Sequence, residues 1–583
     1  MKAAASIPLR PFAAFFHGRV DWKSLWFWCL TLAVALFVIP PLGLLVLSSF
    51  RTVSLGELGF GLSKLTFLNY AEAYSDPKAL AMLLNSFWFA VGSMAAAMIL
   101  GGTLAFLSER TDLRFRGLIP LLVMVPLVMP SVVKGIAWIF LLSPRIGLVN
   151  QPWIALFGRP LISSSSIPAM VWVEGISMSP LAFLLIGSVI QRMDPSLEEA
   201  ADGSGASRWK VLCRITLPLL TPALAGVGLL LFIRGIESFE IPMLMGSEAG
   251  IFVFSTNIYH ALRDTSPPQF GLGFAYSMTL VGITGAGLLW YQHVLKRSER
   301  YTVVSGKGYR PRPFCLGSWK YLAWVFVIFY GVVGILLPFL ILTWASLLPF
   351  YVPPSLDGLS YVSLANYASL LMSPDLWDAL KNTMVLGLVS SGATMFLTVL
   401  ASWFIYRTNI RHRKLLDTLI FLPYMFPGVI LGVAFMIMFL SFENPVYNTI
   451  WIIVLAYCVN FLPVASRFTH AAVIQVHREL EEAAWASGAA FWRTLRHIWV
   501  PLLLPPLING ALFLLILSTK IMSIAALLQG PDSKVLSVYV WSLWNGGGTG
   551  PSSALSVLMI CVLGILTLIS RGLAQKSALG RQL

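Results

Sequence analysis

Ionisable side chains inside apolar stretches are the residues of this sequence best placed to do chemistry. Arg234, Glu237 and Glu240 are spaced three apart in one such stretch, so they lie close to one helical face. Lys520 stands 283 residues after Glu237, at the equivalent place in a second stretch. Because a charge in hydrocarbon costs about 2.5–3.5 kcal/mol on insertion scales, these four residues predict a translocation path or a gate. An Arg234–Glu237 pair within one helix, with Lys520 near the outer boundary, explains the pattern equally well.

Two chemistries follow if this group lines a path. Glu237 would pair with Lys520 as a bridge that opens in one conformation, provided that the two stretches pack symmetrically, and Glu240 would face the path. Alternatively, Glu237 and Glu240 would be transient contacts for a hard cation, which prefers carboxylate oxygen. This pattern predicts no firm metal site. Lys134 and Glu174 are weaker candidates, since a long charged side chain can reach a membrane boundary.

Nothing in the sequence predicts an enzyme active site. The seven histidines and five cysteines show no spacing typical of metal ligands or disulfides. Gly306-Lys307-Gly308 lacks the Gly-x4-Gly-Lys-Ser/Thr spacing of a phosphate-binding loop, which is absent elsewhere too. We therefore expect no cofactor on this chain and no ATPase within it.

Composition places the chain among polytopic helical membrane proteins. Of its 583 residues, 57% are hydrophobic and 11% are charged, which excludes a soluble globular protein. A membrane-spanning helix needs about 20 apolar residues. Twelve stretches reach that length, at residues 26–48, 85–108, 118–142, 167–190, 218–245, 272–294, 321–346, 382–405, 416–440, 449–473, 501–527 and 553–571.

The net charge of +15 orients the protein in the lipid membrane. With a cytoplasmic N-terminus, the predicted outside loops carry only seven of the 40 Lys and Arg residues. This distribution obeys the positive-inside rule and predicts that both termini are cytoplasmic. The excess of positive charge therefore requires no nucleic-acid partner. The first apolar stretch is too long for a signal-peptide core, so we expect it to be retained.

The chain contains an internal duplication. Asn69-Tyr70 matches Asn366-Tyr367 at an offset of 297 residues, and the offset falls to 283 further on, so the first half carries about fourteen extra residues. We expect this insertion within residues 143–160. Six spans in each half give parallel repeats related by an axis along the membrane normal. The predicted divisions are a first half over residues 1–295, a basic cytoplasmic linker over 296–320 and a second half over 321–583.

One charged loop occurs in both halves, near residues 195–217 and 478–500. The first reads LEEAADGSGASRWKVLCRITLP from Leu197, and the second reads LEEAAWASGAAFWRTLRHIWVP from Leu480. Each predicts two short helices broken at glycine, which accepts backbone angles that other residues avoid. The matched residues are Glu199, Ala200, Ala201, Gly205 and Trp209 in the first copy and Glu482, Ala483, Ala484, Gly488 and Trp492 in the second.

The pattern of Glu-Ala-Ala, Gly and Ile-x-Leu-Pro, from which the second copy departs only with Val500 for Leu, resembles the signature loop of ABC importer membrane subunits. The chain resembles two such subunits fused, which implies an all-α, type I ABC importer permease fold of twelve transmembrane helices in a bacterial inner membrane. The resemblance assigns ATPase coupling to both loops. It implies two copies of a separate ABC ATPase, which carry the ATP and Mg, and a periplasmic solute-binding protein.

Several cargoes and one other class fit the pattern. The linker segment SGKGYRPRP is similar to that of fused ferric-iron importer permeases, so ferric iron is the first expectation. Fused thiamine permeases come next, followed by the polyamine and phosphonate branch. A major-facilitator-like secondary transporter also has twelve spans in two parallel halves, but the duplicated Glu-Ala-Ala loop argues against that class.

Overall fold

The structure is a computed structural model that describes residues 22–51, 65–193, 196–298, 314–442 and 445–579. Within these residues every regular element is a helix, apart from two isolated bridges that join Arg51 to Leu65 and Thr111 to Phe314. The predicted all-α class is therefore confirmed. Backbone amides that cross a membrane must bond within their own segment, and helices achieve this.

The first half contains these elements: α1 (Trp22–Ser49), α2 (Leu68–Ser75), α3 (Pro77–Arg110), η2 (Arg116–Leu118), α4 (Ile119–Val128), α5 (Ser131–Leu142), α6 (Asn150–Phe157), α7 (Ile167–Arg192), α8 (Ser196–Gly203), α9 (Arg208–Val211), η3 (Leu212–Thr216), α10 (Leu217–Glu237), α11 (Glu240–Met245), η4 (Ser247–Ala249), α12 (Phe254–Tyr259), η5 (His260–Asp264) and α13 (Phe270–Ser298).

The second half contains these elements: α14 (Trp319–Gly331), η7 (Val332–Leu336), α15 (Leu337–Ser346), η8 (Asp357–Tyr361), α16 (Ala365–Met372), α17 (Pro374–Arg407), α18 (Arg413–Phe421), η9 (Leu422–Met425), α19 (Gly428–Leu440), α20 (Ile450–Gln475), α21 (Arg478–Ala486), α22 (Phe491–Thr494), η10 (Leu495–Trp499), α23 (Val500–Lys520), α24 (Ser523–Leu528), α25 (Leu536–Asn545) and α26 (Thr549–Leu579).

In the described part of the chain, ten helical segments are long and apolar enough to cross a membrane, and the total is twelve if each of two bent pairs is one span. The bent pairs replace two straight spans of the prediction. Residues 116–128 and 131–142 meet at 94°, and residues 413–425 and 428–440 meet at 105°. Pro130 and Pro427 follow the bends, where proline supplies no amide hydrogen and the preceding residue is extended.

Two further predicted spans, 218–245 and 501–527, end earlier than expected. α10 ends at Glu237, Ser238 is extended and α11 follows, while in the second half Ile521 is extended between α23 and α24. At each break a side-chain hydroxyl group donates a hydrogen bond to a backbone carbonyl oxygen. Ser255 Oγ donates to Ser238 O at 2.5 Å, and Tyr457 Oη donates to Ile521 O at 2.6 Å. These breaks lie in apolar sequence, so hydropathy did not reveal them.

The duplication extends to individual contacts. Asn69 Nδ2 donates to the carbonyl oxygens of Ser49 and Arg51 at 3.0 and 2.7 Å. Asn366 Nδ2, at the 297-residue offset, donates to those of Ser346 and Leu348 at 2.9 and 2.7 Å. The Asn-Tyr pairs thus fasten each half's first helix to the short helix that follows it.

The extra residues of the first half form α6, as the offset change predicted. Asn150 is fully buried at its start and donates to Leu142 O and Ile162 O at 2.9 and 2.8 Å. Its amide therefore satisfies carbonyl oxygens on both sides of the insertion. The structure describes only the two ends of the predicted linker, because residues 299–313 lie outside the described part of the chain.

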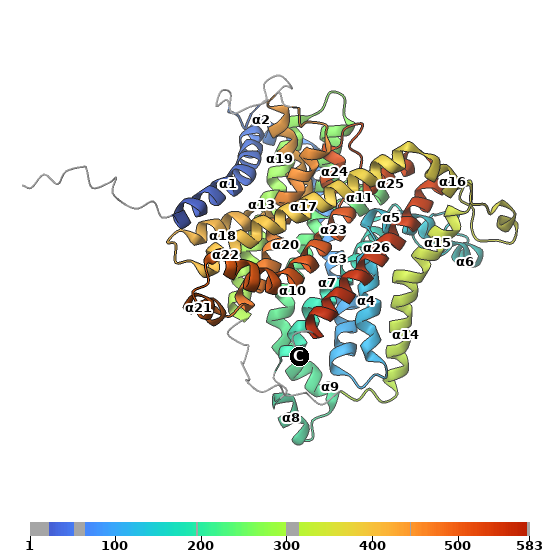
Figure 1. Cartoon of the computed structure of the whole chain (residues 1–583). Helices are drawn as coiled ribbons and strands as arrows, with labels where there is room; N and C mark the ends of the chain where they lie inside the picture. Colours follow the sequence, from blue (N-terminus) through green and yellow to red (C-terminus); the bar gives the residue numbers. More distant parts are fainter. Residues whose placement is uncertain (1–21, 52–64, 194–195, 299–313, 443–444, 580–583) are drawn as a thin grey trace, which may run out of the picture.

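The first helix of each half packs against the other half. α1 lies beside α18 and α19, and α15, which continues α14, packs on α5 (Figure 1). The rings of Phe27 and Phe404 contact edge to face with centroids 5.8 Å apart. The hydroxyl groups of Tyr330 and Ser179 hydrogen-bond at 2.8 Å. The two halves are therefore joined by an exchange of helices as well as by the linker.

Candidate functional site

The two repeated loops fold in the same way. Each begins as a helix, α8 or α21, turns at a glycine and continues into a second short helix, α9 or α22. Gly205 and Gly488 both have φ of +76°, the left-handed conformation that glycine adopts without steric cost. Figure 1 shows α8 and α21 projecting from the helical body at two separate places. The predicted break at glycine is confirmed in both copies.

A matched pair of backbone hydrogen bonds closes each turn. The amide of Ala206 donates to Ala201 O at 3.0 Å, and the amide of Ala489 donates to Ala484 O at 2.9 Å. This six-residue closure around a left-handed glycine is the Schellman motif, which satisfies the last helical carbonyl oxygens. The repeated Ala and Gly residues thus specify a turn of fixed geometry.

A buried ion pair anchors each loop to the long helix of its own half. Arg110 at the end of α3 contacts the Glu198 carboxylate at 3.1 Å, and Arg407 at the end of α17 contacts Glu481 at 3.2 Å. The arginine side chains are only 6% and 7% exposed. The glutamates directly precede the predicted Glu199 and Glu482. These anchors were not predicted from the sequence, although the two arginines match at the 297-residue offset and the two glutamates match at the 283-residue offset.

Each anchor has further partners. Thr216 Oγ1 donates to Glu198 Oε1 at 2.5 Å. At the matched position in the second half, the ring of Trp499 lies beneath the Arg407 guanidinium, 5.0 Å from its centroid. Burial raises the pKa of Glu481 from its ordinary value, while the positive charge of Arg407 opposes that shift. The loops are therefore rigidly attached at their starts.

The predicted coupling residues divide into two groups. Ala200, Ala201, Ala483 and Ala484 supply carbonyl oxygens to the turn, and Glu482 is exposed on α21. The side chains of Glu199, Trp209 and Trp492 lie outside the described part of the structure. The coupling role of all ten predicted residues therefore stays a prediction.

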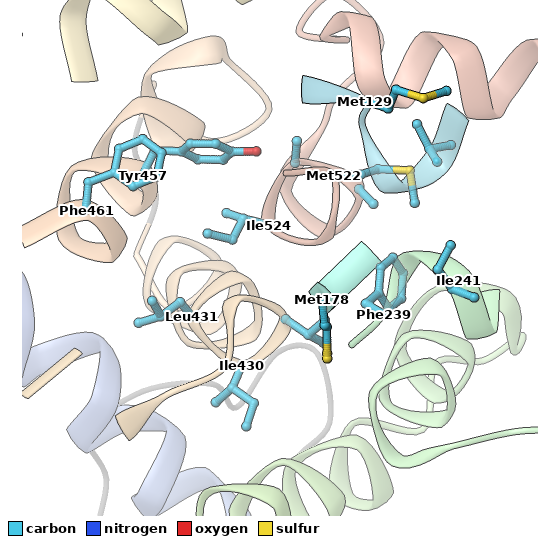
Figure 2. Packing of buried hydrophobic residues seen from close by; sticks show 14 of the residues in the cluster. Met129, Met178, Phe239, Ile241, Ile430, Leu431, Tyr457, Phe461, Met522 and Ile524 are labelled. Atoms are coloured by element: carbon cyan, nitrogen blue, oxygen red, sulfur yellow. The ribbon is translucent and has the colours of Figure 1, made fainter. Parts of the chain in front are cut away.

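Between the halves, apolar side chains from both repeats fill the centre of the molecule. Figure 2 shows Met129, Phe239, Tyr457, Met522 and Ile524 converging there, and each is at most 2% exposed. Met129, Phe239 and Met522 belong to three of the four helix breaks, so these three breaks meet at this interface. The interface is closed by packed apolar side chains.

Charged residues surround this apolar centre, but in a different pairing from the one predicted. Glu237 pairs with Arg234 of its own helix at 3.3 Å, instead of with Lys520. Lys520 Nζ donates to Leu127 O of the first half. Arg234 crosses in the opposite direction, with its guanidinium 5.4 Å from the ring centroid of Tyr424. Leu127 and Tyr424 match at the 297-residue offset, so the two cations make reciprocal contacts between the halves.

Glu240 also contacts the other half. Its Oε1 accepts hydrogen bonds from the amides of Met522 and Ser523 at 3.1 and 3.3 Å. These amides lie at the start of α24, where they have no partner within the helix. The carboxylate of the first half thus caps a broken helix of the second half.

Lys134 and Glu174 are interior residues and do not lie at a boundary. They are 4% and 7% exposed, and Lys134 Nζ donates to Ser177 Oγ and to Pro126 O. Glu174 Oε2 is buried and has no hydrogen-bond partner among the described residues. Lys134 interacts electrostatically with Glu174 and Glu240. Across the described ranges, no group of three or more His, Cys, Asp or Glu side chains could hold a metal ion.

Comparison with known families identifies the architecture. Residues 97–300 and 398–578 match the family described as the binding-protein-dependent transport system inner membrane component. The chain belongs to this family. The permease carries the domain twice, which confirms the internal repeat and the type I ABC importer permease fold. Members of this family are transport components, so the expectation of a transport permease is confirmed, and the secondary-transporter alternative is wrong.

The permease has relatives in several bacteria. A putative ferric transport system permease of Haemophilus influenzae is 26% identical over 71% of this chain and 65% of its own length, so the chain spans just under two thirds of that relative. A probable ABC transporter permease of Sinorhizobium fredii is 24% identical over 97% of this chain and 98% of its own. A putative 2-aminoethylphosphonate transport system permease of Salmonella paratyphi A is 24% identical over 34% of this chain and 77% of its own.

Proposed function

We propose that this permease is the membrane subunit of an ATP-driven importer, and that each repeated loop docks on one of two copies of an ABC ATPase. The observation that carries this proposal is the matched geometry of the loops, with the same glycine turn and the same buried anchor in both halves. Two equal projections suit two identical partners. ATP-driven closure of the ATPase pair would then move both halves through their anchors, as in rigid-body switching.

Co-purification tests the partnership. Solubilised from native membranes, the wild-type chain is expected to bring down an ABC ATPase at two copies per permease. A variant that carries Gly205→Val and Gly488→Val together should insert normally but retain little ATPase. Equal retention by the variant and the wild type would show that these loops are not the docking elements.

For the cargo we propose ferric iron, delivered outside by a solute-binding protein. Two observations support this proposal. The linker sequence SGKGYRPRP is similar to that of fused ferric-iron importer permeases, and the Haemophilus influenzae relative is named for ferric transport. Uptake of radiolabelled ferric iron, in cells that lack other iron importers, is expected to require this chain. A 2-aminoethylphosphonate importer is the second candidate, because of the Salmonella relative. Uptake of labelled phosphonate without iron uptake would establish that alternative and reject iron.

We further propose that the reciprocal contacts between the halves form the closed gate. Lys520 donates a hydrogen bond to Leu127, Arg234 contacts the ring of Tyr424, and Glu240 caps the start of α24. Separation of the halves must break all three contacts. Lys520→Met removes a cation but keeps much of the side-chain length. It is expected to raise basal solute leak in proteoliposomes, whereas Lys381→Met, at the outer part of α17, should not. Identical leak from both variants would refute the gate.

A further inference from the structure

A basic hollow lies beside the second coupling loop. Its volume is about 620 Å³, and its walls come from the start of α1, the end of α17, the connection over residues 408–412 and the second loop. We call it the loop-side pocket. Lys23, Arg407 and Arg411 line it together with one carboxylate, Glu481. Because Glu481 is already bound to Arg407 at 3.2 Å, it does not offset the positive charge that Arg411 brings to the pocket.

The corresponding edge of the first half is covered. There the amide of Asp112 donates to Phe314 O at 3.2 Å, and the amide of Leu316 donates to Asp112 Oδ1 at 2.9 Å. The neighbouring hollow, about 390 Å³ in volume, is lined by no charged residue. Asn409 stands at the position of Asp112 in the second half, and no described segment makes these contacts with it. Within the described residues, which begin at Trp22, this basic edge is therefore found in the second half alone.

The pocket opens where the protein surface changes from apolar to charged. Trp22, Trp26 and Trp28 at the start of α1 are 68%, 65% and 44% exposed. Tryptophan gathers at the level of lipid headgroups. The ring of Trp28 lies 5.5 Å from that of His412, so the aromatic and basic sides of the pocket are in contact. This combination suits a ligand with both an apolar and an anionic part.

We propose that the loop-side pocket binds the headgroup of an anionic phospholipid. Arg411 is exposed and has no ion-pair partner among the described residues, so its guanidinium is available to the phosphate. Guanidinium matches phosphate with two parallel hydrogen bonds. The bound lipid would lie between α1 and the Arg407–Glu481 anchor, and would thus hold the second coupling loop against the membrane.

The first half supplies a matched control, because Arg114 stands 297 residues before Arg411 on the covered edge. Purified full-length permease in nanodiscs that contain phosphatidylglycerol and phosphatidylcholine is examined by native mass spectrometry. Arg411→Gln is expected to retain phosphatidylglycerol about fivefold less than the wild type, the effect of one interfacial cation. Arg411→Lys should keep most of the binding, and Arg114→Gln should bind like the wild type.

Four results would overturn the proposal. Equal retention by Arg411→Gln and the wild type would remove the site, and so would an equal loss in Arg114→Gln. Displacement of the lipid by millimolar glycerol phosphate would assign the pocket to a soluble phosphate ester. An Arg411→Gln variant that keeps the lipid but loses the ATPase would assign the pocket to that subunit. Lipid retention is measured without ATPase or cargo, so it is independent of the proposed transport function.

Discussion

At the scale of single residues, two buried arginines connect the repeated loops to the long helices. The side chains of Arg407 and Glu481 are 7% and 11% exposed, and loss of one partner from a buried pair costs about 3–5 kcal/mol because the other charge stays unpaired. Glu481→Gln is therefore expected to lower the thermal unfolding temperature in detergent. The neighbouring Glu482 is exposed, so Glu482→Gln should leave that temperature unchanged. Equal melting of the two variants would contradict the anchoring role.

Glu240 offers a second residue-scale prediction. Its carboxylate accepts hydrogen bonds from the amides of Met522 and Ser523, and a buried donor left without an acceptor costs about 1–3 kcal/mol. Glu240→Leu is expected to destabilise the permease by about that amount. Glu240→Gln, which keeps a carbonyl oxygen, should lie nearer the wild type. Chemical denaturation of the purified protein checks the order, and a Gln variant as unstable as the Leu variant would count against the capping role.

The residue pairings show what the offset could and could not predict. Glu237 and Lys520 do occupy matched positions, but Arg234 lies one turn away on the same helix as Glu237 and reaches it without any approach between the halves. Lys520 contacts a carbonyl oxygen that the bend before Pro130 releases. Because hydropathy did not reveal that bend, the sequence could not supply this partner.

At the scale of elements, the left-handed turn in each coupling loop is the most exacting requirement. A left-handed residue with a side chain costs roughly 1–2 kcal/mol, and more when it is β-branched. Gly205→Val is expected to deform the loop and abolish ATPase stimulation, while Gly205→Asn should retain part of it. Gly203 has no positive φ and open space around it, so Gly203→Val serves as the control in the same loop. Normal stimulation by Gly205→Val would contradict this prediction.

Most elements could be predicted from hydropathy and the repeat, but the bends could not. Pro180 and Pro463 lie inside α7 and α20, which continue without interruption. Pro130 and Pro427 occupy similar apolar sequence and follow sharp bends. The difference lies in the surroundings, since Lys134 and Lys520 donate to carbonyl oxygens at the first bend and Thr284 donates to Met425 O at the second.

At the scale of the whole molecule, the distribution of Lys and Arg predicts the orientation in the membrane. Reporter fusions after residues 310 and 578 are expected to be cytoplasmic, and a fusion near residue 360 is expected to be periplasmic. Alkaline phosphatase and fluorescent-protein fusions, compared at each position, make the measurement. If the reporters after residues 310 and 578 lie on opposite sides of the membrane, the second half contains an odd number of spans. Parallel repeats would then be impossible.

The exchange of first helices has a consequence for the order of synthesis. α1 leaves the ribosome about 390 residues before its neighbour α19 is complete, which amounts to roughly 20–80 s at 5–20 residues per second. Until then α1 lacks its partners in the second half and can pack only on lipid and on first-half elements such as α13. Together with α14 it has the highest mean hydropathy among the ten unbroken spans. α1, which waits longest for its partners in the second half, is thus well suited to residence in the bilayer.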